Sequence, residues 1–280
     1  MTRSAVLELE FSVSALHALQ KVLDLPVLRG QLHLQPQLNE TIVPLTDAER
    51  NFLVEKGFMI DGVIDPEVAS VLRILATPDA EIELTLTRPG FKDSFVSIVR
   101  RGELIITACF RGGDMVYIDA YEGRATEQDV TILAVDTIRA ELFPDGDDGV
   151  GADFQDAIIA LNDLVAGLSA FNPEDWRREF SRLGIPADAA SIMHEGEVSN
   201  QGRAEFSAYL NHENGRTAPD TVLRVTLSPS GAQMTSFATD QNRKRWLTVE
   251  PYSASVLERR VLSALRAVPD RAWMTHKRTD

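Results

Sequence analysis

The chain has 280 residues, of which 44% are hydrophobic and 25% charged, a composition typical of a folded globular protein and not of a disordered one. Its 28 Lys and Arg against 42 Asp and Glu give a net charge of −14, which repels phosphate backbones and anionic lipids. We therefore expect neither nucleic-acid binding nor membrane insertion. Glu8 and Glu10 interrupt the apolar start of the chain, which lacks a signal-peptide core, so we expect a cytoplasmic protein.

The single cysteine, Cys109, follows Ile105-Ile106-Thr107-Ala108 and precedes Phe110, a run typical of a β-strand. One cysteine cannot form an intramolecular disulfide. Inside an apolar strand the thiol is expected to be a small buried hydrophobe and not a catalytic thiolate.

The first half of the chain alternates between helical and strand patterns. Asp65-Pro66-Glu67 predicts a helix start, because Asp is a favoured cap and Pro fits the first turn. Short glycine-containing turns then separate four apolar runs, as in an antiparallel meander. In chain order we expect a strand over 6–11, a helix from Ser12 or Ser14 that Pro26 ends, a connection over 29–46, a helix over 47–56, a helix from Asp65 that Pro78 ends, strands over 82–87, 95–100, 104–110 and 115–121, and a helix over 126–142.

An acidic, glycine-rich stretch over 144–153 predicts a linker, and the second half repeats the order of the first. The strand and capped helix that begin at Trp246 match those that begin at Met115, 131 positions earlier (246 minus 115). We therefore expect two related halves, 1–143 and 154–280, in one compact unit. The expected elements of the second half are a helix through 158–168, a helix over 174–183, a helix from Pro186, strands over 204–211, 222–227, 233–238 and 246–249, and a helix over 255–268 with its cap at Ser255.

The sequence matches none of the common signatures of catalysis or metal binding. The five histidines have no zinc-ligand spacing, and His194-Glu195-Gly196-Glu197 is expected at a helix end that enters a loop. Asp145-x-Asp147-x-Gly149 resembles the start of a calcium loop, but Val150 stands where that loop needs glycine. No nucleophile elbow, Walker A loop or dinucleotide fingerprint is present. We therefore assign no catalytic residue, no metal and no cofactor.

Basic clusters lie at two predicted strand ends, Arg100-Arg101 and Arg243-Lys244-Arg245. Such residues could grip acidic or carbonyl groups of a partner. Clusters of this kind at strand ends are usually solvated turn residues, and we expect that here.

The order and spacing of the predicted elements and the length of the chain together resemble those of one known family. The chain is similar to the EspG family, the chaperones of type VII (ESX) secretion in mycobacteria and their relatives. The similarity covers nearly the whole chain, although no single motif is diagnostic by itself. The segments that carry it are Phe11 to Leu25, Val68 to Pro78 with the strand Glu81 to Leu86, Arg100-Arg101-Gly102-Glu103 with the turn Arg111-Gly112-Gly113-Asp114, and the closing Trp246-Leu247-Thr248-Val249 with the final helix.

The resemblance implies a mixed α/β (α+β) fold, a central, mainly antiparallel β-sheet flanked by helical bundles in two quasi-symmetric halves. It also implies a cytoplasmic chaperone, not an enzyme. Such a chaperone would bind the helical tip of a PPE protein within its PE–PPE heterodimer, keep it soluble and deliver it to the secretion machinery. Covering an exposed apolar tip prevents its self-association. Without its client the protein would be a monomer or a weak homodimer.

On this reading the binding surface lies on the sheet and last helix of the second half, together with the turn over 88–93. That turn is short here, whereas some family members carry a longer loop that contributes to partner contact. The candidate partner-binding residues are Phe91, Lys92, Arg224, Gln233, Ser236, Arg243 and Lys244. Two alternatives stay open, a small-molecule enzyme with a cleft between the halves and a self-associating structural protein.

Overall fold

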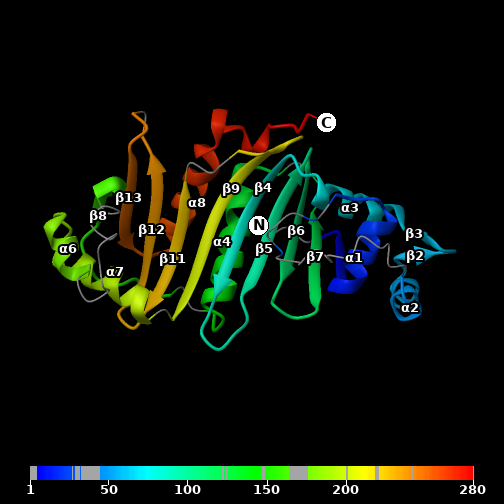
Figure 1. Ribbon diagram of the computed structural model, residues 1–280, viewed down its shortest axis with the longest axis horizontal. Coiled ribbons are helices and arrows are strands. Elements are labelled where there is room, and N and C mark those ends of the chain that lie inside the picture. The colour runs from blue at the N-terminus through cyan, green and yellow to red at the C-terminus, as the bar shows by residue number, and fades with distance from the viewer. Residues whose placement is uncertain are drawn as a thin grey trace.

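Antiparallel strands dominate the computed structural model of the chain (Figure 1). The structure describes residues 5–26, 28, 32, 45–121, 123, 125–146, 149–163, 176–199, 201–217, 221–240 and 242–279, without the side chains of 176 and 177. Over these residues eleven strands form one sheet, with a separate two-stranded hairpin beside it. The mixed fold with a large antiparallel sheet confirms the expected fold class.

The strand order of the sheet has the same pattern in both halves: from each outer edge inward come the first, fifth, fourth, third and second sheet strands of that half. It runs β1-β7-β6-β5-β4-β9-β11-β12-β13-β8, so β4 and β9 pair antiparallel at the centre, with Glu83 opposite Ser207. Each five-stranded half has its first strand at the outer edge. The division into 1–143 and 154–280 around a linker stays a prediction. The first-half strands are β1 (Leu7–Ser12), β4 (Ala80–Thr87), β5 (Ser94–Arg101), β6 (Leu104–Phe110) and β7 (Met115–Tyr121). The others are β8 (Ala157–Ala160), β9 (Gly202–His212), β11 (Val222–Ser228), β12 (Gly231–Thr239) and β13 (Arg245–Pro251), with β10 (Gly215–Arg216) paired to the end of β9 and the hairpin β2 (Met59–Ile60) and β3 (Val63–Ile64).

One face of the sheet is covered at its centre by two helices that also contact each other. These are α4 (Glu127–Leu142) and α8 (Ala254–Ala267), which pack on β4, β9 and β11. Because side chains alternate along a strand, the even-numbered residues of β4 and β9 point into this core. Phe206 and Leu84 are fully buried there, as is Trp273 of the 3₁₀ segment Pro269–Met274 that follows α8.

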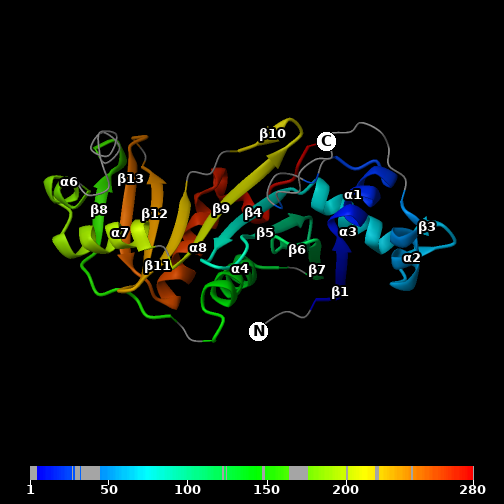
Figure 2. The same cartoon turned by 60° about the horizontal axis from the view of Figure 1, so that its bottom comes forward.

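The opposite face is covered only toward its two ends (Figures 1 and 2). In the first half α3 (Pro66–Ala76) packs on β5 and β6, beside α1 (Val13–Val22) and α2 (Asp47–Glu55). In the second half α7 (Ala187–Ser199) packs on β11 and β12, with α6 (Trp176–Arg182) beside it. Between these two groups the face formed by β4 and β9 has no described helix packed extensively on it.

Local chemistry sets most helix starts. The Ser12 hydroxyl accepts from Ala15 N at 3.0 Å and begins α1, and the Asp65 carboxylate accepts from Glu67 N at 2.8 Å and begins α3. Thr126 and Asp129 cap each other's backbone at the start of α4, as the sequence predicts. The cap of α8 is Ser253, two residues before the expected Ser255.

Two sequence predictions are corrected. Ile158 and Ile159 were expected in a helix but form β8, with Ile158 exposed (70%) and Ile159 buried (5%), the alternation of a strand. Residues 161–163 of that expected helix are helical, and its remainder, 164–168, lies outside the described residues. His194 to Glu197 lies inside α7 and not in a loop. A methyl group on Gly196 would lie 2.3 Å from Gln233 Nε2, so a larger residue there would displace the Gln233 side chain from its place under α7.

The end of the predicted linker is built into the sheet. Gly151 bridges to Ala232, and Ala152 N donates to Ala232 O at 2.9 Å. A Cβ at Gly151 would lie 2.2 Å from the carbonyl oxygen of Tyr252, which is backbone and cannot rotate away. We expect Gly151→Ala to lower the free energy of unfolding by about 1–3 kcal/mol, measured by urea denaturation. Gly215→Ala is the matched control, because a Cβ there meets open space; equal stability of the two variants would refute the close contact.

Cys109 lies half-buried on β6, in a position that suppresses its reactivity. Burial raises the pKa of its thiol to about 11, more than nearby Arg111 lowers it. At pH 8 the thiolate fraction is then on the order of one in a thousand, against about a quarter for an ordinary thiol. We expect iodoacetamide to alkylate the folded protein roughly two orders of magnitude more slowly than the urea-unfolded chain. Equal rates would show that the thiol is open to solvent.

Candidate functional site

The uncovered middle of the sheet carries polar side chains on a rigid support. The odd-numbered residues of β4 and β9 point to this side, away from α4 and α8. We call the half-buried part of it the central face; it consists of Thr85, Thr87, Arg203, Glu205, Ser207, Tyr209 and Arg224. It is bounded by α3 on one side and by α7 on the other.

An ion-pair network crosses the central face beside α7. Arg224 on β11 pairs with Glu205 on β9 at 2.8 Å and with Glu197 on α7 at 3.3 Å. Arg203 reaches the other oxygen of Glu197 at 3.1 Å. Because all four side chains are partly open to water, the network contributes little to stability. It does hold two arginines and two glutamates in fixed positions, which can orient polar groups of a partner.

A second polar cluster covers the other end of β4 and β9. Arg216 on β10 reaches back to form an ion pair with buried Glu83, and its guanidinium lies 3.9 Å from the ring centroid of Tyr209. Burial, followed by the hydrogen bond to Glu83, raises the pKa of Tyr209 to about 12. The phenol is therefore a neutral hydrogen-bonding group at physiological pH and not a base.

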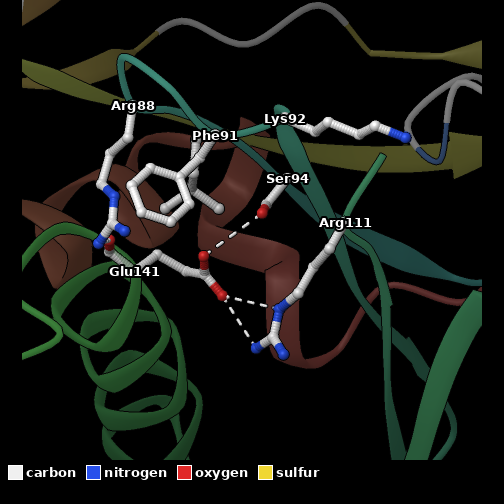
Figure 3. Close-up of a pocket in the computed structure, with 7 residues that line it drawn as sticks. Arg88, Phe91, Lys92, Ser94, Arg111 and Glu141 are labelled. Carbon is white, nitrogen blue, oxygen red and sulfur yellow. Dashed lines mark hydrogen bonds and ion pairs between the residues drawn. The ribbon is translucent and has the colours of Figure 1, made fainter. Parts of the chain in front are cut away.

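The turn between β4 and β5 presents an exposed aromatic ring (Figure 3). Phe91 is 66% exposed, and the Arg88 guanidinium lies 4.0 Å from its ring centroid. Arg88 Nη1 also donates to the Glu141 carbonyl oxygen at 2.9 Å, near the end of α4. The Glu141 carboxylate pairs with Arg111 at 2.9 Å and accepts from the Ser94 hydroxyl at 3.3 Å. These groups line a cavity of about 150 Å³ with Leu86 and Lys92, which we call the Phe91 pocket.

The turn adjoins one end of the central face. Thr87, the last residue of β4, pairs with Arg203 of β9, and the Cγ of Arg88 lies 3.5 Å from where a Cβ on Gly202 would stand. The Phe91 turn and the Arg203–Glu197–Arg224 network thus lie at the same end of the sheet. They face opposite sides of it: Leu86, Arg88 and Glu141 place the Phe91 pocket on the α4 side, and the network lies on the α7 side.

The seven predicted partner-binding residues do not form one cluster. Phe91 and Lys92 lie exposed on the turn, and Arg224 lies on the central face. Gln233 is 3% exposed, with its amide donating to the Ile192 carbonyl under α7, and Ser236 is 6% exposed. We leave both out of the proposed surface, since a buried side chain cannot meet a partner without rearrangement.

Arg243 and Lys244 lie exposed in the turn from β12 to β13, at the opposite end of the sheet from Phe91 (Figure 1). Lys244 lies 4.3 Å from the ring centroid of Trp246 and Arg243 has a φ of 60°, so both belong to a tight local turn. They are separated from the Phe91 turn by the length of the strands.

Sequence reasoning missed most of the central face. Arg203, Glu205, Ser207 and Tyr209 alternate with apolar Ala204, Phe206 and Ala208 along β9. That alternation predicts a strand with one polar side. It does not tell whether a helix covers that side, which only the packing of α3 and α7 decides.

The described part of the chain shows neither a metal centre nor a membrane span. No three His, Cys, Asp or Glu side chains within it come together as ligands. Likewise, none of its helices has the length and apolar character needed to cross a bilayer.

Comparison with known proteins assigns the chain to a family. The sequence model of the EspG family matches residues 12–262. The ESX-5 secretion-associated proteins EspG5 of Mycobacterium tuberculosis and Mycobacterium marinum are 23% and 21% identical to it, over 97% of both chains in each pair. A solved structure of the Mycobacterium tuberculosis type VII secretion system chaperone EspG5, in complex with a PE25-PPE41 dimer, shares the fold with a TM-score of 0.79 at 17% identity, covering 97% of this chain and all of that one. The match of the family model over residues 12–262 shows that the chain belongs to the EspG family.

Proposed function

We propose that this protein is a cytoplasmic chaperone of type VII secretion that binds a PE–PPE heterodimer through the helical tip of its PPE subunit. The observation that carries the proposal is the central face, a sheet surface left open between two helical groups in a member of the EspG family. The related EspG5 has been solved in complex with a PE25-PPE41 dimer, which supports the same class of client here.

The proposed surface suits reversible binding of a helix end. The sheet beneath it is rigid, because β5, β4, β9 and β11 are each paired on both sides. The ion pairs of the central face offer fixed polar contacts, and the exposed Phe91 ring at the end of β4 offers an apolar contact. An interface that combines polar and apolar contacts binds specifically and still allows later release of the client.

The same surface gives no support to catalysis. The carboxylates of Glu197 and Glu205 are paired with arginine, and the pKa of Tyr209 is raised away from neutrality. General acid–base chemistry needs groups whose pKa lies near the working pH. We therefore propose a binding protein without enzymatic activity, a monomer or weak homodimer when free, with its two halves acting as one unit.

Co-expression with PE–PPE pairs from the same genome tests this function. Each pair is expressed with and without the chaperone, and the mass of the complex is measured by size exclusion with light scattering. We expect one pair, or a few, to form a 1:1:1 complex. If no pair co-elutes with the folded chaperone, the proposed function is wrong.

A further inference from the structure

A second part of the sheet is open, on the side opposite the central face. It lies at the edge formed by β6, β7 and β1, where no described helix on the α4 side packs extensively on β7 or β1. Leu9, Phe11 and Ile118 of these strands are buried under α1 and α3, so their neighbours along the strands point to the α4 side. We call this surface the acidic face; it consists of Glu8, Glu10, Thr107, Tyr117 and Asp119.

The acidic face holds negative charge that the described residues do not neutralise. Glu8 lies directly opposite Asp119 in the pairing of β1 with β7, and like charges in that position repel each other. Burial, followed by the charge of Glu8, raises the pKa of Asp119. No described lysine or arginine pairs with Glu8, Glu10 or Asp119. Arg111 follows β6, but its guanidinium is paired with Glu141. The arrangement therefore costs the free protein stability and leaves the carboxylates available to a cation.

An exposed tyrosine lies among these carboxylates. Tyr117 is 41% exposed and stands opposite Glu10 in the same strand pair. An aromatic ring attracts a cation to its face, and carboxylates accept hydrogen bonds from the edge of a guanidinium. Because arginine presents both a flat face and a fork of N–H donors, it fits this combination better than lysine.

The charge also limits what can cover the acidic face. A second copy of the chain would bring the same carboxylates against each other, and nucleic acid and anionic lipid are repelled. A positively charged protein segment remains. Membrane proteins carry such segments on their cytoplasmic side, which is enriched in lysine and arginine. Since the acidic face and the central face lie on opposite sides of the sheet, a client and such a segment can be bound together.

We propose that the acidic face binds an arginine-containing cytoplasmic segment of a membrane protein of the secretion apparatus, with Glu8 and Asp119 as the pairing carboxylates and Tyr117 as the stacking ring. This inference rests on the proposed delivery of a client to that apparatus. It adds a docking surface that the client leaves free and the chemistry of the partner that meets it.

Peptide binding to a charge-neutral double variant tests the inference. The Lys- and Arg-rich cytoplasmic segments of the membrane proteins of the same secretion system are made as labelled peptides, and fluorescence anisotropy gives their affinity. We expect at least one segment to bind, and Glu8→Gln with Asp119→Asn to weaken it roughly ten-fold at low salt. Glu55→Gln with Asp61→Asn removes the same two charges from exposed positions on α2 and the hairpin, and should change the affinity less than two-fold. The ten-fold loss should shrink at high salt.

Two further measurements separate this docking surface from folding and from the client. Because the Glu8 and Asp119 changes relieve a repulsion, the double variant should keep or exceed the wild-type Tm, whereas a purely structural role predicts a lower one. It should also still form the 1:1:1 complex with PE–PPE.

The inference is overturned if no segment binds the wild-type protein, or if the double variant binds with wild-type affinity; the chaperone function stands in both cases. Loss of the client complex in the double variant would also overturn it, because the acidic face would then belong to the client site. Binding of a segment by a wild-type protein that forms no complex with any PE–PPE pair would refute the chaperone function and support the docking surface.

Discussion

Replacing Arg100 by methionine is expected to lower the free energy of unfolding by about 3–5 kcal/mol, the largest single effect on stability we predict. Arg100 is 3% exposed at the end of β5, although the sequence suggested a solvated turn residue. Burial lowers the pKa of its guanidinium, and Asp79 opposes that shift. Methionine fills the space of the side chain but leaves the buried carboxylate of Asp79 without its cation.

The reason for so large an effect is that Arg100 ties the end of the chain to the first half. Its Nε donates to the Trp273 carbonyl at 2.8 Å and its Nη2 to the His276 carbonyl at 2.6 Å. Asp79 accepts from the backbone of Arg278 at 2.9 Å on the same segment. Losing Arg100 therefore leaves several buried polar groups unpaired at once.

Thermal and urea unfolding measure this prediction. A loss of 3–5 kcal/mol corresponds to a fall in Tm on the order of 10 °C for a domain of this size. Arg73→Met, on the exposed side of α3, is the matched control and should change Tm by no more than a degree or two. Equal effects of the two variants would mean that the hydrogen bonds around Arg100 do not hold the C-terminal segment.

Replacing Phe91 by aspartate is expected to weaken client binding about 30-fold while the protein stays folded. The ring is 66% exposed, so its loss costs the free protein little. In the complex the same ring would be covered, and a carboxylate in its place would have to be desolvated beside an apolar client. Titration calorimetry against the co-purified PE–PPE pair gives the affinity.

Val63→Asp is the control for general effects of placing a charge on an exposed apolar residue. Val63 is 67% exposed on the hairpin at the far end of the first half, away from the proposed surface. We expect its client affinity to match the wild type. Unchanged affinity of Phe91→Asp would remove the turn from the interface.

Much of the fold could be predicted from the sequence because its signals are local. The capping box at Thr126 and the Asp-Pro start of α3 act within one helical turn. The meander from β4 to β7 follows from apolar runs separated by short turns. The repeated order of elements anticipated a strand order that is the same from both edges.

The misplaced elements depend on contacts between distant residues. Ile158 and Ile159 fit either a helix or a strand, and the pairing of β8 with β13 decides between them. From the sequence alone Arg100 is expected to be one of two basic turn residues, because its buried partners lie more than 170 positions away at Trp273 and His276. No local pattern reports such a contact.

The candidate site was only partly predictable for the same reason. Phe91 stands out in the sequence as an aromatic residue in a turn, and the structure leaves it exposed. Gln233 also lies on a predicted strand, yet α7 covers it. Whether a polar strand face is open or covered depends on helix placement, which alternation along the strand does not encode.

Hydrogen exchange of the purified complex against the free chaperone tests most directly whether the central face and the Phe91 turn hold the client. We expect slower exchange on binding in the turn from Arg88 to Asp93 and in β9 and β11, with no change in the hairpin of β2 and β3. Protection confined to α2 and that hairpin, or to α4 and α8 on the other face, would contradict it.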